Sequence, residues 1–135
     1  SKDYPKALEM AQMEQHINPN IAESYLLAAE AYYRMGQYSS CASEYQKAIP
    51  KRPQTADIYI SMARCYRLSG ALESAVTILD KAAQKESGHP DIYKELGATF
   101  HMQGLLVEAY TAYERYLALA PNAPDRADIE RIMKE

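Results

Sequence analysis

The sequence lacks the features that usually mark a catalytic, metal-binding or membrane-embedded protein. No apolar run approaches the roughly 18 residues that a membrane helix needs. There is no HExxH motif, no glycine-rich phosphate loop, no GxSxG elbow and no kinase-like set of motifs. The histidines His16, His89 and His101 are scattered and join no Cys/His ligand set. These absences predict a protein that is not an enzyme, carries no metal or cofactor and does not insert into a membrane.

Cysteine is scarce, and the two that occur, Cys41 and Cys65, form no CxxC motif. Two cysteines are too few for a disulfide framework. Both fall on apolar helix faces, so the favoured interpretation is a pair of small buried hydrophobic residues. A Cys41–Cys65 disulfide or a redox role is the alternative. Reduced cysteines favour a cytoplasmic location, with a periplasmic or other soluble compartment left open.

Signal and transit peptides are also missing from the sequence, which starts at Ser1 without methionine. We therefore expect the chain to be part of a longer one. Its 135 residues are 47% hydrophobic and 24% charged, as in a soluble globular domain with a real core. The net charge of −3 argues against nonspecific nucleic-acid binding, which depends on phosphate neutralisation by lysine and arginine.

What the sequence does contain is an internal repeat. Three sets of landmarks recur at an interval of 34 residues: Gly36, Gly70 and Gly104; Tyr25, Tyr59 and Tyr93; Tyr32, Tyr66 and Phe100. Between the landmarks, apolar residues follow helical spacing, and no segment alternates with the period of a strand. A helical hairpin repeated at this period predicts an all-α solenoid.

The helix signals divide each repeat in the same way. Asn20–Met35 is expected as a first helix, ended by Gly36, and Ser39 or Ser40 as the start of a second helix. That second helix should end at Pro50, because proline deep in a helix costs about 3 kcal/mol. Pro53 is then expected to turn the chain. In the first segment, Asp3 is suited to capping the helix and Pro5 to its first turn.

Aligned in this register, the chain divides into five parts of one domain. Residues 1–19 match a second helix whose first helix is absent, since Tyr4, Ala7 and Pro19 correspond to Tyr38, Cys41 and Pro53. Residues 20–55, 56–89 and 90–123 form three full repeats. Residues 124–135 are predicted to form a capping helix with a charged outer face.

The recurring residues resemble the tetratricopeptide repeat (TPR) family. The resemblance depends on Tyr25, Ala28, Ala29, Tyr32, Gly36, Tyr38, Tyr45, Ala48 and Pro53, and on the same positions of the next two repeats. It implies a right-handed superhelix of antiparallel helical hairpins. It also implies that the first helix of each hairpin lines a concave groove that binds a protein or peptide partner.

Carried onto this sequence, the resemblance places ten residues at the partner-binding groove: Leu26, Glu30, Tyr33, Arg34, Ile60, Arg64, Arg67, Lys94, Ala98 and His101. Tyr33, Leu26 and Ile60, with Met102, are candidates for an apolar strip along it. When the acids in the first turn of each helix are set aside, Glu30 faces four basic residues. The middle of the groove is then net basic on a net acidic chain.

The leading function from the sequence is a non-catalytic adaptor or assembly scaffold. Its groove is expected to receive an acidic segment or a terminal carboxylate of a partner, because arginine binds carboxylates bidentately. The alternative is a solvated face on which Glu30 pairs with Arg34 or Arg64. Two further functions are a substrate-recruiting accessory domain of a larger enzyme and a self-association module. Self-association would use the apolar flank of the N-terminal half repeat at Ala7, Leu8 and Ala11.

Overall fold

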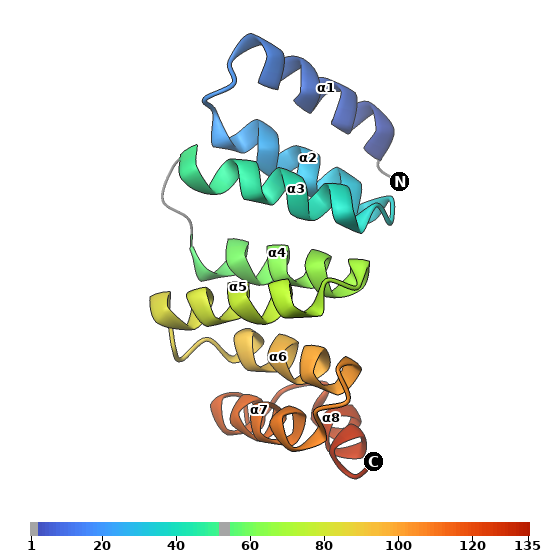
Figure 1. The fold of residues 1–135 in the computed structure, drawn as a ribbon, viewed down its shortest axis with the longest axis vertical. Coiled ribbons are helices and arrows are strands. Elements are labelled where there is room, and N and C mark those ends of the chain that lie inside the picture. The colour runs from blue at the N-terminus through green and yellow to red at the C-terminus, as the bar shows by residue number, and fades with distance from the viewer. Residues whose placement is uncertain (1–2, 52–54) are drawn as a thin grey trace.

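The chain folds as a stack of helices, in which each helix from α2 to α7 is antiparallel to the one before it (Figure 1). The computed structural model describes residues 3–51 and 55–135. Its described elements are α1 (Tyr4–Ile17), α2 (Ala22–Arg34), α3 (Tyr38–Ala48), the 3-10 turn η1 (Ile49–Lys51), α4 (Ala56–Ser69), α5 (Leu72–Lys85), α6 (Pro90–Met102), α7 (Leu106–Leu119) and α8 (Arg126–Met133). The all-α fold class predicted from the sequence is confirmed, since no strand occurs within these ranges.

The helix ends follow local signals. The side chain of Asp3 caps α1 by accepting a hydrogen bond of 3.1 Å from the backbone N–H of Lys6. Gly36, Gly70 and Gly104 adopt φ values of 78°, 90° and 78° at the turn inside each hairpin. This left-handed conformation is strained for residues with a Cβ atom, which explains why glycine recurs there.

Two boundaries differ in detail from the sequence prediction. α3 begins at Tyr38 rather than at Ser39 or Ser40, since Tyr38 is its first helical residue. As expected, Pro50 does not continue α3, and the chain passes through the 3-10 turn η1 instead. Pro53, predicted to turn the chain, lies outside the described residues.

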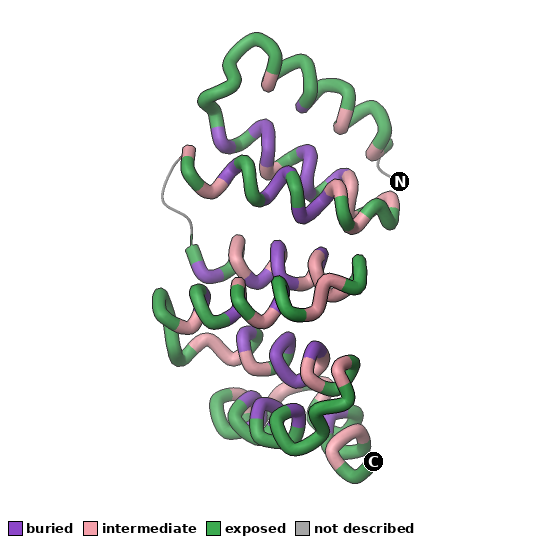
Figure 2. Tube along the Cα trace, viewed as in Figure 1, coloured by how far each residue is buried: buried purple, intermediate pink, exposed green. Residues whose placement is uncertain are grey.

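The core runs along the stack from α2 to α8 in three clusters. Small residues occupy the closest approaches between helices: Ala28, Ala29, Cys41, Ala48, Ala63, Ala75 and Ala82 are each at most 1% exposed. At Gly97 the packing leaves no room for a side chain, because a Cβ atom there would lie 2.5 Å from the ring of Tyr113. Figure 2 shows the buried positions on the helices inside the stack, whereas α1 at its end is almost wholly exposed.

Cys41 on α3 and Cys65 on α4 form a disulfide, with Cα atoms 6.0 Å apart. The favoured interpretation of two unbonded cysteines is therefore wrong, although both are buried as expected. The cause is tertiary, because packing α3 against α4 brings together residues that are 24 positions apart. The bond joins the second helix of one hairpin to the first helix of the next.

Candidate functional site

The ten residues predicted for the groove come from α2, α4 and α6, the first helices of the three hairpins. Four lie on α2 (Leu26, Glu30, Tyr33, Arg34), three on α4 (Ile60, Arg64, Arg67) and three on α6 (Lys94, Ala98, His101). The structure brings some of them together and separates others. We refer to this strip of α2, α4 and α6 as the inner surface.

Ile60 does not reach the inner surface. It is only 4% exposed and packs in the core cluster with Ala63, Leu79 and Leu96. Its predicted place in the apolar strip is therefore wrong, because α4 turns this residue toward α5 and α6. Leu26 and Tyr33 are half-buried and pack against the cluster between α3 and α4.

Two of the four basic residues predicted for the groove, Arg34 and Lys94, are paired with acidic residues of the same chain. Arg34 donates from Nε to Glu30 across 3.1 Å, the pairing that the sequence left open as an alternative. Its hydrogen bond with Glu30 also raises the pKa of Arg34. Lys94 lies 2.7 Å from Asp125, beyond the C-terminal end of α7. These two cations therefore interact within the chain.

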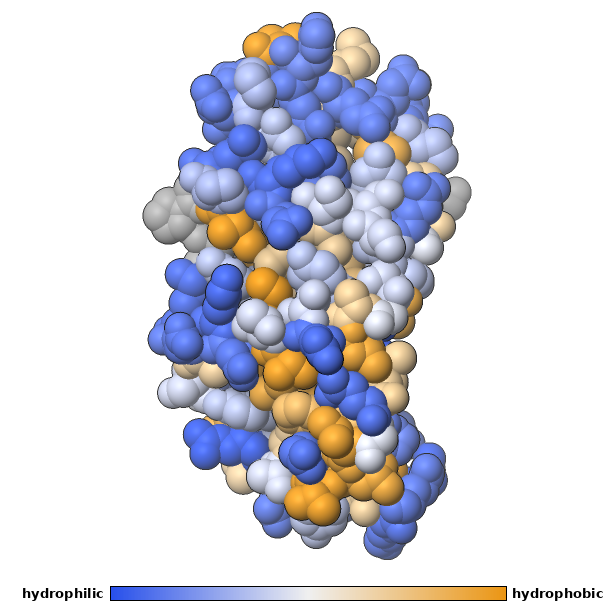
Figure 3. Space-filling view, in the orientation of Figure 1, coloured by the Kyte–Doolittle hydropathy of each residue, from blue (hydrophilic) through white to orange (hydrophobic). Residues whose placement is uncertain are grey.

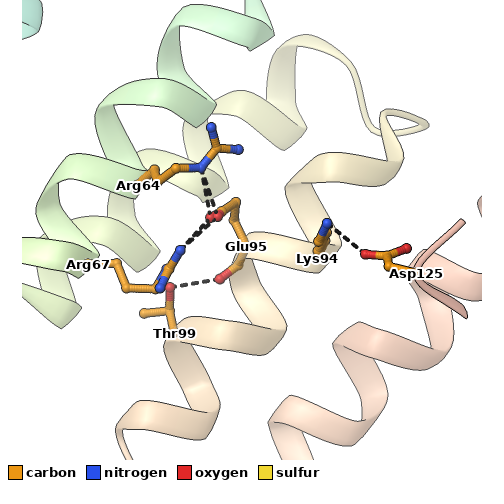
Figure 4. Close-up of polar contacts among 6 residues, drawn as sticks. All are labelled: Arg64, Arg67, Lys94, Glu95, Thr99 and Asp125. Atoms are coloured by element: carbon orange, nitrogen blue, oxygen red, sulfur yellow. Dashed lines mark hydrogen bonds and ion pairs between the residues drawn. The ribbon is translucent and has the colours of Figure 1, made fainter. Parts of the chain in front are cut away.

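Arg64 and Arg67 meet at a buried carboxylate that the sequence interpretation missed. Nε of Arg64 lies 3.3 Å and 3.4 Å from the two oxygens of Glu95. Nη2 of Arg67 lies 3.1 Å and 3.4 Å from the same oxygens (Figure 4). Glu95 is 5% exposed, and its backbone carbonyl accepts a 2.7 Å hydrogen bond from Thr99. This cluster ties α4 to α6.

A signal for Glu95 exists in the repeat register. Leu27 and Ser61 occupy the same position in the two preceding repeats, and the side chain of Ser61 lies beside Tyr45 of the preceding hairpin. The position therefore faces the neighbouring repeat. A glutamate there has to find a cation on the adjacent first helix, since a buried unpaired carboxylate is costly.

The two arginines differ in how much of each guanidinium group remains free to bind a partner. The side chain of Arg67 is 19% exposed and that of Arg64 is 37% exposed. Arg64 contacts Glu95 only through Nε, and its two terminal nitrogens point away from that carboxylate (Figure 4). Within the described residues, those two nitrogens donate no hydrogen bond. Arg64 can therefore bind a second anion while it stays anchored to Glu95.

Asp125 and Tyr116 form a second polar group, where α6 and α7 meet the segment before α8. Lys94, and then the Tyr116 hydroxyl at 2.6 Å, hold the pKa of Asp125 below its usual range. Burial, together with that hydrogen bond, raises the pKa of Tyr116 to about 12. These contacts fix the C-terminal segment against the last hairpin.

Apolar cavities lie away from the inner surface. One of about 540 Å³ opens between α6 and α7, lined by Tyr93, Leu96, Phe100, Val107 and Ala112 among others. Figure 3 shows apolar surface gathered in the lower half of the view, over α5 to α7. His101 lines a pocket of about 50 Å³ beside α8. His101 is thus set apart from the arginine cluster.

Comparisons with known proteins agree with this architecture. Residues 26–90 match the tetratricopeptide repeat family. The crystal structure of MamA superposes with a TM-score of 0.84 at 18% identity, covering 98% of this chain and 85% of that one. TTC0263, a thermophilic TPR protein of Thermus thermophilus, gives 0.78 at 25% identity, with 96% and 72% covered. The chain has the fold of a tetratricopeptide repeat solenoid.

A third TPR structure, YrrB, is described as having an unusual peptide-binding site. It superposes with a TM-score of 0.79 at 15% identity and covers 96% of this chain and 67% of that one. A comparison with curated protein sequences gives no match. TPR domains bind protein or peptide partners, and the TPR fold found here is typical of a protein–protein interaction module.

The described ranges 3–51 and 55–135 contain neither a candidate metal site nor a candidate membrane-spanning helix. No group of three histidine, cysteine, aspartate or glutamate residues there could hold a metal ion. No helix within them has both the length and the apolar character needed to cross a bilayer.

Proposed function

We propose that this TPR solenoid is a non-catalytic adaptor whose inner surface binds an acidic segment or a terminal carboxylate of a partner protein at Arg64. The observation that carries the proposal is the pair of outward-pointing terminal nitrogens of Arg64 (Figure 4). A guanidinium anchored through Nε holds these donors in a fixed plane, which suits bidentate contact with a carboxylate. YrrB, which has a peptide-binding site on a TPR fold, supports a peptide as the kind of partner.

Side chains beside Arg64 supply the rest of the surface. Tyr33 and Leu26 on α2 are half-buried, and Leu68 on α4 and Met102 on α6 are exposed. They differ from repeat to repeat, unlike the recurring core residues. A surface that varies along the solenoid suits one particular partner segment, with apolar contacts flanking a single charge contact.

The test is titration of labelled peptides followed by fluorescence anisotropy. The peptides are a glutamate-rich one with an amidated end, an apolar one with a free terminal carboxylate, its amidated form and a lysine-rich one. We expect the first two to bind and the last two to bind more weakly. Arg64→Gln should raise the Kd of the first two about tenfold, the 1.4 kcal/mol loss of one charge-assisted contact.

Arg131→Gln is the matched control, because it removes the same charge from exposed α8, away from the inner surface. It should leave both Kd values unchanged. Arg64→Lys keeps the charge but loses the planar pair of donors, so it should recover only part of the affinity. Equal binding of acidic peptides by the wild type and Arg64→Gln would refute the proposal.

A further inference from the structure

The N-terminal face of the solenoid, formed by α1 and α2, is apolar and uncovered. Met10, Met13 and Ile17 on α1 are 63%, 58% and 76% exposed. Leu27 on α2 is 61% exposed. In Figure 2, α1 lies at the N-terminal end of the stack and is almost wholly exposed. Apolar side chains gathered in this way mark an interaction surface.

A groove runs between the two helices on this face. It encloses a cavity of about 360 Å³, and its lining includes Ala7, Met10, Ala11, Glu14, Ile21 and Leu27. We call it the end groove. Its walls are mainly aliphatic, and its floor includes the buried Ala11.

The repeat register shows what kind of element fits the end groove. Cys41, Ala75 and Ala109 take the position of Ala7 in the following repeats, and all are at most 3% exposed. They are buried because α2, α4 and α6 pack against α3, α5 and α7 in the three hairpins. Each inner counterpart of the end groove is thus filled by an α-helix, so a helix fits the groove itself.

The charges beside the groove indicate which helix. Lys6 and Glu14 lie four residues on either side of Met10, and neither side chain forms an ion pair within the described part of the chain. On a helix, four residues correspond to about 6 Å along the axis. Two copies of α1 crossing antiparallel at Met10 would therefore place each Lys6 opposite Glu14 of the other copy.

We propose that the protein forms a two-fold symmetric dimer in which α1 of each copy lies along the end groove of the other, centred on Met10. The same register sets Met13 of one copy against Ala7 of the other, three residues from the centre, so that a large side chain meets a small one. A two-fold axis makes every contact occur twice, which doubles the contribution of each pair. This inference goes beyond the proposed function, because it uses a different face from the inner surface.

Charge-swap variants test the dimer by sedimentation equilibrium over a range of protein concentrations. Lys6→Glu places a second carboxylate opposite Glu14, and Glu14→Lys places two lysines together. Each should raise the dimer Kd about tenfold, since two exposed pairs change from attraction to repulsion. The double variant Lys6→Glu/Glu14→Lys should restore dimerisation. An equimolar mixture of the two single variants should form heterodimers, because both pairs become complementary again.

Loss of the dimer in the charge-swap variants would not result from unfolding of α1. Lys6→Glu puts an acid in the first turn of α1 and Glu14→Lys puts a base near its last turn, and both stabilise the helix through its dipole. Glu9→Lys is the matched charge control, and Val107→Asp on α7 is the control for Met10→Asp, since both place an aspartate at an exposed apolar position, 76% exposed at Val107 and 63% at Met10. Neither should alter the dimer, whereas Met10→Asp should abolish it.

Three results would overturn the inference. The first is a monomer at every concentration. The second is a failure of Lys6→Glu/Glu14→Lys to restore dimerisation, or a loss of the dimer in Val107→Asp. The third is a longer form of this chain that stays monomeric because an upstream helix of its own fills the end groove.

Discussion

Glu95 is the residue at which a single change should show most clearly what holds neighbouring hairpins together. The residue is 5% exposed, and its carboxylate receives four N–O contacts of 3.1–3.4 Å from Arg64 and Arg67. The perturbation is Glu95→Gln, which keeps the shape and one oxygen acceptor but removes the charge. Two guanidinium groups then lose their counter-ion at the interface of α4 and α6.

The magnitude follows from burial. Removing one partner of a fully buried ion pair costs about 3–5 kcal/mol, because the remaining charge is left uncompensated. Here the side chains of the two arginines keep 19% and 37% of their exposure, so water can partly replace Glu95. We therefore expect Glu95→Gln to lower the free energy of unfolding by about 2 kcal/mol, below the fully buried range.

Glu30→Gln is the matched control. Its pair with Arg34 has the same 3.1 Å distance as the Arg67–Glu95 contact, but both side chains are about half exposed. An exposed i,i+4 pair contributes about 0.3 kcal/mol. Comparing the two variants separates the effect of burial from that of distance.

The assay is urea unfolding followed by circular dichroism, with native-state hydrogen exchange to locate the loss. Glu95→Gln should raise exchange rates of the amides in α4 and α6 more than those in α2, because repeat proteins open locally. The reasoning is refuted if Glu95→Gln costs no more than Glu30→Gln, or if the faster exchange is spread evenly over all helices.

Three further predictions concern other parts of the stack. Gly97→Ala should lower the free energy of unfolding by about 2 kcal/mol in urea titration, because its Cβ would lie 2.5 Å from the ring of Tyr113, and an unchanged midpoint would contradict this. Reduction of the Cys41–Cys65 disulfide should cost about 3 kcal/mol for a bridge spanning 24 positions, seen as a lower Tm with reductant and absent in Cys41→Ala/Cys65→Ala. Because burial raises the pKa of Tyr116 to about 12, against about 10 when unfolded, the folded chain binds that proton more tightly. Its contribution is complete below pH 10 and is lost as pH rises toward 12, so Tyr116→Phe should lose less stability over that window in urea titrations.

The inner surface shows where prediction from sequence stopped. α2, α4 and α6 were expected to supply it, and residues on them such as Arg64 and Met102 are exposed or partly exposed. Its predicted basic cluster did not account for Glu95, because the residue at that position differs in each repeat (Leu27, Ser61, Glu95) and the prediction followed only the basic residues. Ile60 was predicted to lie on the inner surface but is buried against α5 and α6. The spacing of apolar residues along α4 does not show which side of the helix a neighbouring hairpin will cover.

The sequence by itself determined the architecture, because the landmarks recur at a constant interval and each hairpin needs its neighbours to bury an apolar face. Gly36, Gly70 and Gly104 mark turns through their own backbone freedom, a local property that can be read from one chain. Tertiary structure alone decided which side chains meet across repeats: Cys41 with Cys65, Lys94 with Asp125, and Glu95 with two arginines. These pairs depend on how far one hairpin is rotated against the next, and that angle is set by packing along the whole interface rather than by any short stretch of sequence.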